Sequence, residues 1–234
     1  MSQRMPNNRY KRIKSVLDKR QTDLTVCLDE VHKHHNLSAI VRTADAVGIH
    51  DVHAVWPENQ KRVTGNTSGG SKNWVETHMH ITVEDAIADI RERTPGIQLL
   101  ATNLSDTAVD FREIDYTKPT AIIVGQEQTG ISDTALALAD QHIVIPMEGM
   151  VQSLNVSVAT ALILFEAQRQ RKIANMYDDS DLCKSIRHKL LFEGCHPVIA
   201  KQCKLKGLDY PAIDDEGEII ATEAFWNTLR YKAS

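Results

Sequence analysis

PTAIIVGQEQTGIS, residues 119–132, joins an apolar run to a glycine-rich turn and decides the fold class of this chain. The run AIIV is typical of a strand that is buried on both faces, as in a parallel sheet. Gly125 and Gly130 permit a tight turn, and Ser132 can cap a helix over residues 132–140. The stretch therefore predicts a strand, a turn and a helix, which is the repeating pattern of an α/β protein.

The same alternation continues on both sides of this stretch. Short β-rich runs predict strands at residues 24–28, 52–56, 97–104, 119–125 and 142–146. Apolar residues at helical spacing predict helices at residues 9–20, 35–48, 83–93, 132–140, 153–172, 185–194 and 198–207. A Gly-rich loop is expected at residues 66–71. Because the strands are continuously apolar, we expect a mainly parallel sheet flanked by helices.

Charge and composition divide the chain into three segments. Residues 1–20 form a basic N-terminal helical arm, residues 21–175 the α/β domain, and residues 176–234 a C-terminal helical extension with an acidic tail. The arm is basic although the whole chain has a formal net charge of -4. Such an arm can follow the phosphates of a nucleic acid or can be an ordinary solvated helix face, and charge alone leaves both open.

Composition also bounds the location of the protein. No apolar run approaches the roughly 20 residues that span a bilayer, and the first residues lack the apolar core of a secretory signal. The four cysteines lie far apart without a C-x-x-C pair, which favours reduced thiols over disulfides or a zinc site. We expect a cytoplasmic protein without a membrane partner.

Ligands of open α/β sheets bind at the carboxyl ends of the strands, so the loops that follow the strands are the candidate sites. The loop after residues 119–125 has neither the G-x-G-x-x-G dinucleotide pattern nor a P-loop lysine, and on its spacing alone it can be a plain connection. Ser153 and Asn155 open a helix and can either cap it or meet a ligand. The histidines within residues 32–35 invite a metal interpretation, but no carboxylate or cysteine at zinc-type spacing completes the set, so no metal is expected.

Three segments together resemble the motifs of the SPOUT RNA methyltransferases, and within them the TrmH branch. They are HNLSAIVRTADAVG at 35–48, IIVGQEQTGIS at 122–132 and IPMEGMVQSLNVSVATALILFEAQR at 145–169, in the order and spacing of that family. The similarity extends through DLTVCLDEVHK, TSGGS, DFREIDYTKPT and the basic arm, and it covers most of the first 175 residues. One departure is His34, where the family pattern has proline.

The resemblance implies a SPOUT fold with a deep trefoil knot in the C-terminal half of the domain, and a homodimer with its active site at the subunit interface. It implies transfer of a methyl group from S-adenosylmethionine, without a metal, to the ribose 2′-oxygen of the D-loop guanosine at position 18 of tRNA. The catalytic set would be Arg42, Asn36, Glu127, Ser153 and Asn155. The residues that hold the methyl donor would be Thr102, Gly125, Ile145, Met147 and Leu154. The residues that contact tRNA would be Arg12, Arg20, His35, Arg169 and Arg171.

Three other functions compete with this one. The nearest is a related SPOUT enzyme that methylates ribosomal RNA or another tRNA ribose. A noncatalytic tRNA-binding protein is disfavoured because Asn36, Arg42, Glu127 and Asn155 are all present. A nucleotide-hydrolysing enzyme is disfavoured because the P-loop lysine is missing. In the favoured reaction Arg42 is permanently charged, so we expect it to stabilise the developing alkoxide and not to accept its proton.

Overall fold

The structure is a computed structural model, and it describes residues 7–31, 33–56, 70–178 and 180–230 of the chain. Most of the predicted Gly-rich loop (66–69), His32 and the first part of the basic arm lie outside the described residues. The chain divides into two compact units, one of residues 20–179 and one that joins residues 1–19 to residues 180–234. The N-terminal arm and the C-terminal extension, which we expected as separate segments, therefore belong to one unit.

The larger unit is built on a seven-stranded sheet with the strand order β3-β2-β1-β6-β4-β7-β5. Every pairing in it is parallel, so the predicted α/β class and parallel sheet are confirmed. The strands are β1 (Leu24–Leu28), β2 (Asp51–Val55), β3 (Glu76–His80), β4 (Gln98–Thr102), β5 (Val109–Asp110), β6 (Thr120–Val124) and β7 (Gln141–Val144). The five predicted strands correspond to β1, β2, β4, β6 and β7.

The two strands at the edges of the sheet, β3 and β5, were not predicted. β3 reads ETHMH, so its polar residues gave no apolar run, and its side chains are half-buried or exposed. β5 has only two residues and is shorter than any pattern can signal. Edge strands need less apolar surface than central strands because they have a neighbour on only one side.

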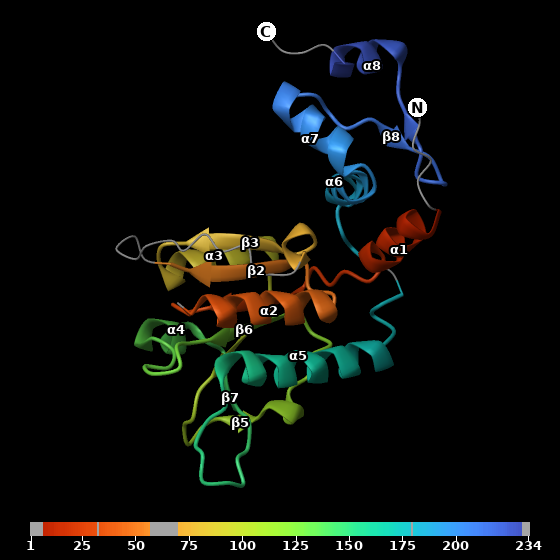
Figure 1. The fold of residues 1–234 in the computed structure, drawn as a ribbon. Coiled ribbons are helices and arrows are strands. Elements are labelled where there is room, and N and C mark those ends of the chain that lie inside the picture. The colour runs from red at the N-terminus through yellow and green to blue at the C-terminus, as the bar shows by residue number, and fades with distance from the viewer. Residues whose placement is uncertain (1–6, 32, 57–69, 179, 231–234) are drawn as a thin grey trace. The chain divides into compact units, whose positions relative to one another are not determined.

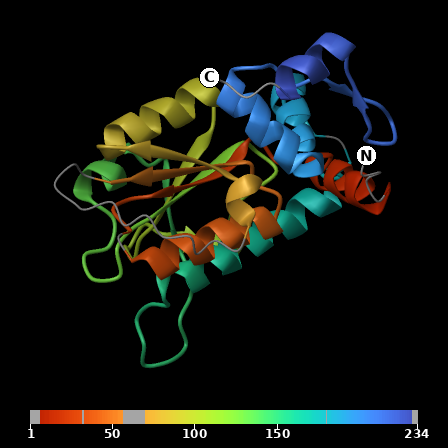
Figure 2. The same ribbon diagram turned by 45° about the horizontal axis from the view of Figure 1, so that its top comes forward.

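Four helices cover the two faces of the sheet. Figure 2 shows α2 (His34–Ala46) and α5 (Val156–Ile173) below the sheet and α3 (Val83–Arg93) above it; α4 (Asp133–Leu138) packs on the side of α3. Alternate residues of β1 supply the two cores, since Val26 belongs to the core under α2 and α5 and Cys27 to the core under α3. Among its described residues this unit also has two short 3-10 helices, Ser71–Asn73 and Phe111–Glu113. Within the described residues, no helix is both long and apolar enough to cross a membrane.

The smaller unit packs α1 (Asn7–Leu17) against α6 (Lys184–Cys195), and both helices are visible in Figure 1. The apolar face of α1 is buried there, and Arg9 Nε donates to the carbonyl of Gly194 at 2.8 Å. The predicted helices 185–194 and 198–207 are α6 and α7 (Pro197–Lys206). The acidic tail forms a hairpin of β8 (Ala212–Ile213) and β9 (Ile219–Ile220), followed by α8 (Glu223–Arg230).

Candidate active site

A cavity of about 300 Å³ lies at the carboxyl ends of β4, β6 and β7. Its walls come from these strand ends and from the loops at residues 125–131 and 145–155 that follow β6 and β7. Val124, Ile143 and Ile163 supply apolar wall, and the polar side chains include Thr102, Asn103 and Gln152. The cavity therefore lies at the edge of the sheet where α/β proteins bind ligands.

The loop at residues 125–131 needs glycine at its first position. A Cβ atom on Gly125 would lie 2.2 Å from the carbonyl oxygen of Gly130, which is closer than any real contact. The loop is closed by two backbone hydrogen bonds between Gln126 and Gly130, at 2.9 and 3.0 Å, and Gly130 has a positive φ of 74°. Ser132 then caps α4 by accepting from the amide of Ala135, as predicted.

The structure brings together all five residues expected to hold the methyl donor. Each of them lines the cavity: Thr102, Gly125, Ile145, Met147 and Leu154. They come from three segments that are far apart in sequence, and they meet because β6, β4 and β7 are neighbours in the sheet. Glu127 and Ser153 of the expected catalytic set line the same cavity, and Ser153 is exposed.

Glu127 is the centre of a polar cluster beside this cavity. Its Oε1 accepts from Nδ2 of Asn155 at 2.5 Å and from Nδ2 of Asn36 at 3.2 Å. Asn155 Nδ2 also lies 3.3 Å from Oδ1 of Asn36. Three of the five expected catalytic residues thus form one hydrogen-bonded group, which we call the Glu127 cluster, and it joins the 125–131 loop to the first turns of α2 and α5.

Lys33 belongs to this cluster and was missed in the sequence. Its ammonium forms an ion pair with Oε2 of Glu127. Hydrogen bonds from Lys33 and Asn36 hold the pKa of Glu127 below its ordinary 4.5, so this carboxylate is ionised at pH 7. A lysine just before a helix is common on protein surfaces, and no local pattern could have paired it with a loop 94 residues away.

Asn155 has two roles, one local and one long-range. Its Oδ1 accepts from the amide of Ser157 at 2.9 Å and so caps α5, while its Nδ2 donates to Glu127. Of the two alternatives that the sequence left open for this residue, the helix cap is confirmed, and a contact with a ligand stays a prediction. The cap fixes the orientation of the amide, so its nitrogen points at the carboxylate.

Arg42 does not join the cluster within one chain. It is exposed on α2, six residues or about 9 Å of helix beyond the buried Asn36. Among the described residues it makes neither a hydrogen bond nor an ion pair. Its guanidinium is therefore available to a ligand or to a second protein chain.

Two of the five residues that the resemblance assigns to tRNA contact, Arg20 and Arg171, are buried, which contradicts that expectation for them. Arg171 has no exposed surface; it pairs with Asp23 at 2.5 Å and donates to the carbonyls of Tyr116 and Lys118. Arg20 is 1% exposed and pairs with Asp45 at 2.6 Å. Both guanidinium groups donate to backbone carbonyls and pair with carboxylates inside the larger unit, so these arginines stabilise the fold.

The other three of these residues lie on the surface. Arg12 is exposed on α1, and His35 is exposed in the first turn of α2. Arg169 is exposed on α5, where Glu166 holds its guanidinium through two hydrogen bonds at 2.7 and 2.9 Å. These three residues remain candidates for contacts with RNA.

A parallel sheet with a looped cavity at its carboxyl edge and a polar cluster beside it defines a ligand-binding α/β protein, and comparisons with known proteins give the family. Residues 23–165 match the SpoU rRNA Methylase family, and residues 169–222 match the family described as SpoU, rRNA methylase, C-terminal. The chain belongs to the SpoU methylase family.

Individual relatives agree with this assignment. The tRNA (guanosine(18)-2'-O)-methyltransferase of Escherichia coli (strain K12) is 57% identical over 228 residues, which cover 97% of this chain and 99% of that protein. The Thermus thermophilus protein of the same name is 54% identical over 183 residues, or 78% and 93% of the two chains. The crystal structure of the A. aeolicus TrmH/SpoU tRNA modifying enzyme has a TM-score of 0.72 at 43% identity and covers 81% of this chain and 96% of that chain. AviRb from Streptomyces viridochromogenes, solved in complex with the cofactor AdoMet, has a TM-score of 0.57 at 29% identity. The match covers 67% of this chain and 64% of that chain.

Proposed function

We propose that this protein transfers a methyl group from S-adenosylmethionine to the ribose 2′-hydroxyl of guanosine 18 in tRNA. The observation that carries the proposal is that one loop, residues 125–131, both lines the cavity and bears Glu127. A donor held in the cavity would therefore lie beside a polar cluster that can receive a ribose. The identity of 57% to a tRNA (guanosine(18)-2'-O)-methyltransferase along nearly the whole chain supports this substrate.

The cavity has the properties that the methyl donor needs. A volume of about 300 Å³ falls within the range of small-molecule sites, and its apolar walls suit the faces of an adenine ring. Gly125 lines the cavity with its backbone, and a side chain at this position would collide with the backbone of Gly130. When bound, the donor supplies an electrophilic methyl group on a positively charged sulfur. Thr102, Gly125, Ile145, Met147 and Leu154 are the residues proposed to hold it.

Arg42 is the proposed stabiliser of the attacking oxygen. A ribose hydroxyl is a very weak acid, and a guanidinium that is always charged cannot take its proton at neutral pH. A fixed cation beside the hydroxyl instead lowers the free energy of the alkoxide that forms as the proton leaves. The exposed position of Arg42, without a partner among the described residues, leaves its charge available for this task.

Glu127 is proposed as a positioning residue. Both of its carboxylate oxygens already accept hydrogen bonds, from Asn36 and Asn155 at Oε1 and from Lys33 at Oε2. It therefore fixes the glycine loop against α2 and α5, and it is poorly placed to accept a further proton. Ser153, exposed at the rim of the cavity, is proposed to contact the ribose or the donor.

A homodimer is proposed to complete the site. Val158, Leu162 and Phe165 are exposed apolar residues at positions i, i+4 and i+7 of α5, so they form one unpartnered stripe. Met150 and Val151 continue the exposed apolar surface in the preceding loop. A second copy on this surface would bury the stripe and would bring Arg42 of one chain towards the Glu127 cluster of the other.

Mixed dimers test this arrangement. R42A and E127Q chains are each expected to be weakly active, and co-refolding them at equal amounts should restore about a quarter of wild-type activity, because half of the dimers would then contain one intact site. No restoration would show that Arg42 acts within its own chain. F165E should give monomers in light scattering.

Arg12, His35 and Arg169 are the residues proposed to contact tRNA, since all three are exposed and can meet phosphate. Removal of residues 1–19 alone would disrupt the smaller unit, because α1 packs on α6 there. The R12A substitution is a cleaner test. It should weaken tRNA binding and reduce its salt dependence while leaving donor binding unchanged.

A deep trefoil knot is proposed in the segment that contains β6, β7 and α5. The strand order supports it, because β4 lies between β6 and β7 although it precedes both in sequence. Stretching single unfolded molecules by their ends tests the proposal. A knotted chain stays shorter than its full contour length, and a chain that extends completely contains no knot.

The decisive experiment incubates the protein with labelled S-adenosylmethionine and unmodified tRNA and maps the methylated nucleotide. Label on the ribose of guanosine 18, and none when that nucleotide carries a 2′-deoxyribose, is the expected result. Label only at another tRNA position or only in ribosomal RNA would identify a different SpoU substrate. We place this reaction in the cytoplasm, since tRNA is the substrate.

A further inference from the structure

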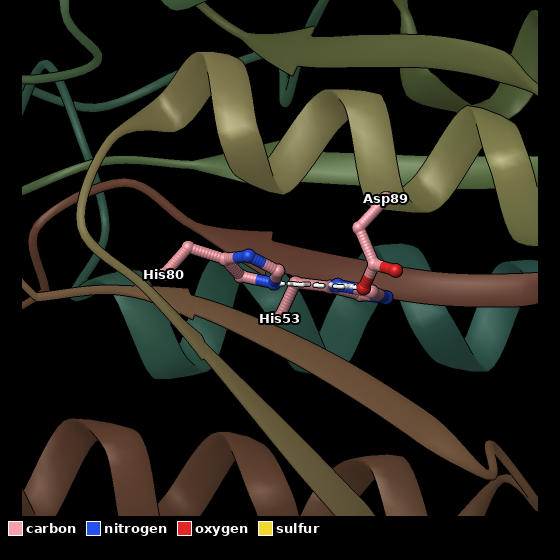
Figure 3. Close-up of side chains that lie close together, drawn as sticks. All are labelled: His53, His80 and Asp89. Carbon is pink, nitrogen blue, oxygen red and sulfur yellow. Dashed lines mark hydrogen bonds and ion pairs between the residues drawn. The ribbon is translucent and has the colours of Figure 1, made fainter.

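Three side chains that play no part in the proposed reaction meet beside β2 and β3, at the other end of the sheet's strand order from β4 and β7. His53 comes from β2, His80 from the edge strand β3 and Asp89 from α3, and Figure 3 shows them converging on one point. His53 is paired in register with His78, so His80, two residues further along β3, points to the same face of the sheet. None of the three lines the cavity at the carboxyl edge.

The spacing of the three nearest atoms is that of ligands around a metal ion. His53 Nδ1 lies 3.1 Å from His80 Nε2 and 3.5 Å from Asp89 Oδ2, and His80 Nε2 lies 3.8 Å from the same Oδ2. Ligands bound tetrahedrally to zinc at about 2.0–2.1 Å are separated by about 3.3–3.4 Å. A single hydrogen bond between the two imidazoles explains the shortest distance but leaves both carboxylate distances long for hydrogen bonds.

A hydrogen bond to Asp89 and the partial exposure of His80 and Asp89 both favour binding of a metal ion at this point. The second oxygen of Asp89, Oδ1, accepts from Arg93 Nε at 2.9 Å, which turns Oδ2 towards the histidines. The His53 side chain is 2% exposed, whereas those of His80 and Asp89 are 12% and 28% exposed, so the point where they meet is reachable from solvent.

We propose that His53, His80 and Asp89 bind one zinc ion per chain, with a water molecule as the fourth ligand. Two imidazoles and a carboxylate are ligands that zinc accepts, and they are less suited to calcium or magnesium, which favour oxygen ligands. The ion would fasten the edge strand β3 to β2 and to α3. The proposed site does not depend on the methyl-transfer function.

A second group, His50, Asp51 and Glu76, is a weaker candidate. Its ligand atoms also lie within 4.8 Å of one another, but Oδ1 of Asp51 is already bonded to His78 at 2.6 Å. It also has only one histidine, whereas the His53 group has two. The His53 group is therefore the better zinc site.

The test uses the full-length untagged protein, stripped with a chelator and titrated with zinc in a calorimeter. Wild type should bind one zinc per chain with a dissociation constant of about 1 μM or tighter, and zinc should raise its melting temperature. H80N and D89N should each weaken binding at least about 10-fold, the scale of losing one protein ligand. H78N is the matched control, since it removes a histidine from the same strand outside the ligand set, and it should stay near wild type.

Cobalt substitution reports the geometry independently. Strong visible absorption of the Co²⁺ form is expected for tetrahedral coordination, and it should be absent from D89N. The metal-free melting curves of D89N and H80N show whether these variants still fold. The proposal would be overturned if the wild-type protein bound no zinc. It would also be overturned if H80N and D89N both stayed folded and bound zinc as tightly as the wild-type protein.

Discussion

The two ends of α5 carry polar clusters of opposite kinds. At its first turn, Asn155 joins Glu127 and Lys33 at the carboxyl edge of the sheet, where Lys33 and Asn155 are exposed and a cavity adjoins. In its last turn, Arg171 is fully buried at the amino edge of the sheet, and Asp23 and three backbone carbonyls enclose it. A closed, fully bonded cluster holds the elements together, and an open one can still receive a ligand.

Removal of the buried charge should have the largest effect. R171M leaves Asp23 and the carbonyls of Tyr116 and Lys118 without their donor, so we expect a loss of about 3–5 kcal/mol in the free energy of unfolding. The measurement is urea unfolding followed by circular dichroism. R169A, two residues away and exposed, is the control and should change stability by less than about 1 kcal/mol. Equal effects of the two variants would contradict the contrast between the clusters.

Arg42 should show the opposite behaviour, with a large effect on activity and little on stability. R42A should lower kcat by about 100-fold or more, the scale of losing one donor to a developing oxyanion. Its melting temperature and its affinity for S-adenosylmethionine should stay near wild type, because the side chain is exposed and lies outside the cavity. Single-turnover assays with bound tRNA measure this, and a kcat near that of wild type would refute the proposed role.

Asn155 separates the local role from the long-range one. N155D keeps an oxygen for the helix cap but replaces the donor to Glu127 by a second carboxylate, so methyl transfer should fall by about 10-fold with stability nearly unchanged. N155A loses both contacts and should in addition lose about 1 kcal/mol of stability. Should N155D be fully active, the hydrogen bond to Glu127 would have no part in the reaction.

Substitution of Lys33 should have the smallest effect on activity, and the effect should appear as a change in the pH dependence of activity. The pKa of Glu127 is lowered in the folded protein, so its contacts are present above the ordinary value of 4.5 and are lost as the pH falls through the lower folded value. K33M removes the main cause of that lowering. The acid limb of its activity profile should move up towards 4.5, with a change of about threefold or less at pH 7. An acid limb that does not move would show that Lys33 does not set this pKa.

The sequence predicted the fold class and the five inner strands because their signals are local. Apolar runs such as AIIV and glycines that must turn are visible within a few residues. The edge strand ETHMH has no such signal, because its only strong requirement is a neighbouring strand to pair with. The cavity residues were found through the family resemblance, and the sheet order explains why residues of three segments lie together.

Sequence alone determined the α/β pattern, the glycine turn at residues 125–131 and the helix caps at Ser132 and Asn155, since each depends on atoms close along the chain. Tertiary structure alone decided which arginines are buried, because Arg169 and Arg171 look alike in sequence and differ only in what packs against α5. It also decided that Lys33 meets Glu127 and that side-chain atoms of His53, His80 and Asp89 lie within 4.8 Å of one another. Such contacts depend on strand order and register, which are set by burial over the whole domain and leave no mark at fixed spacing in the chain.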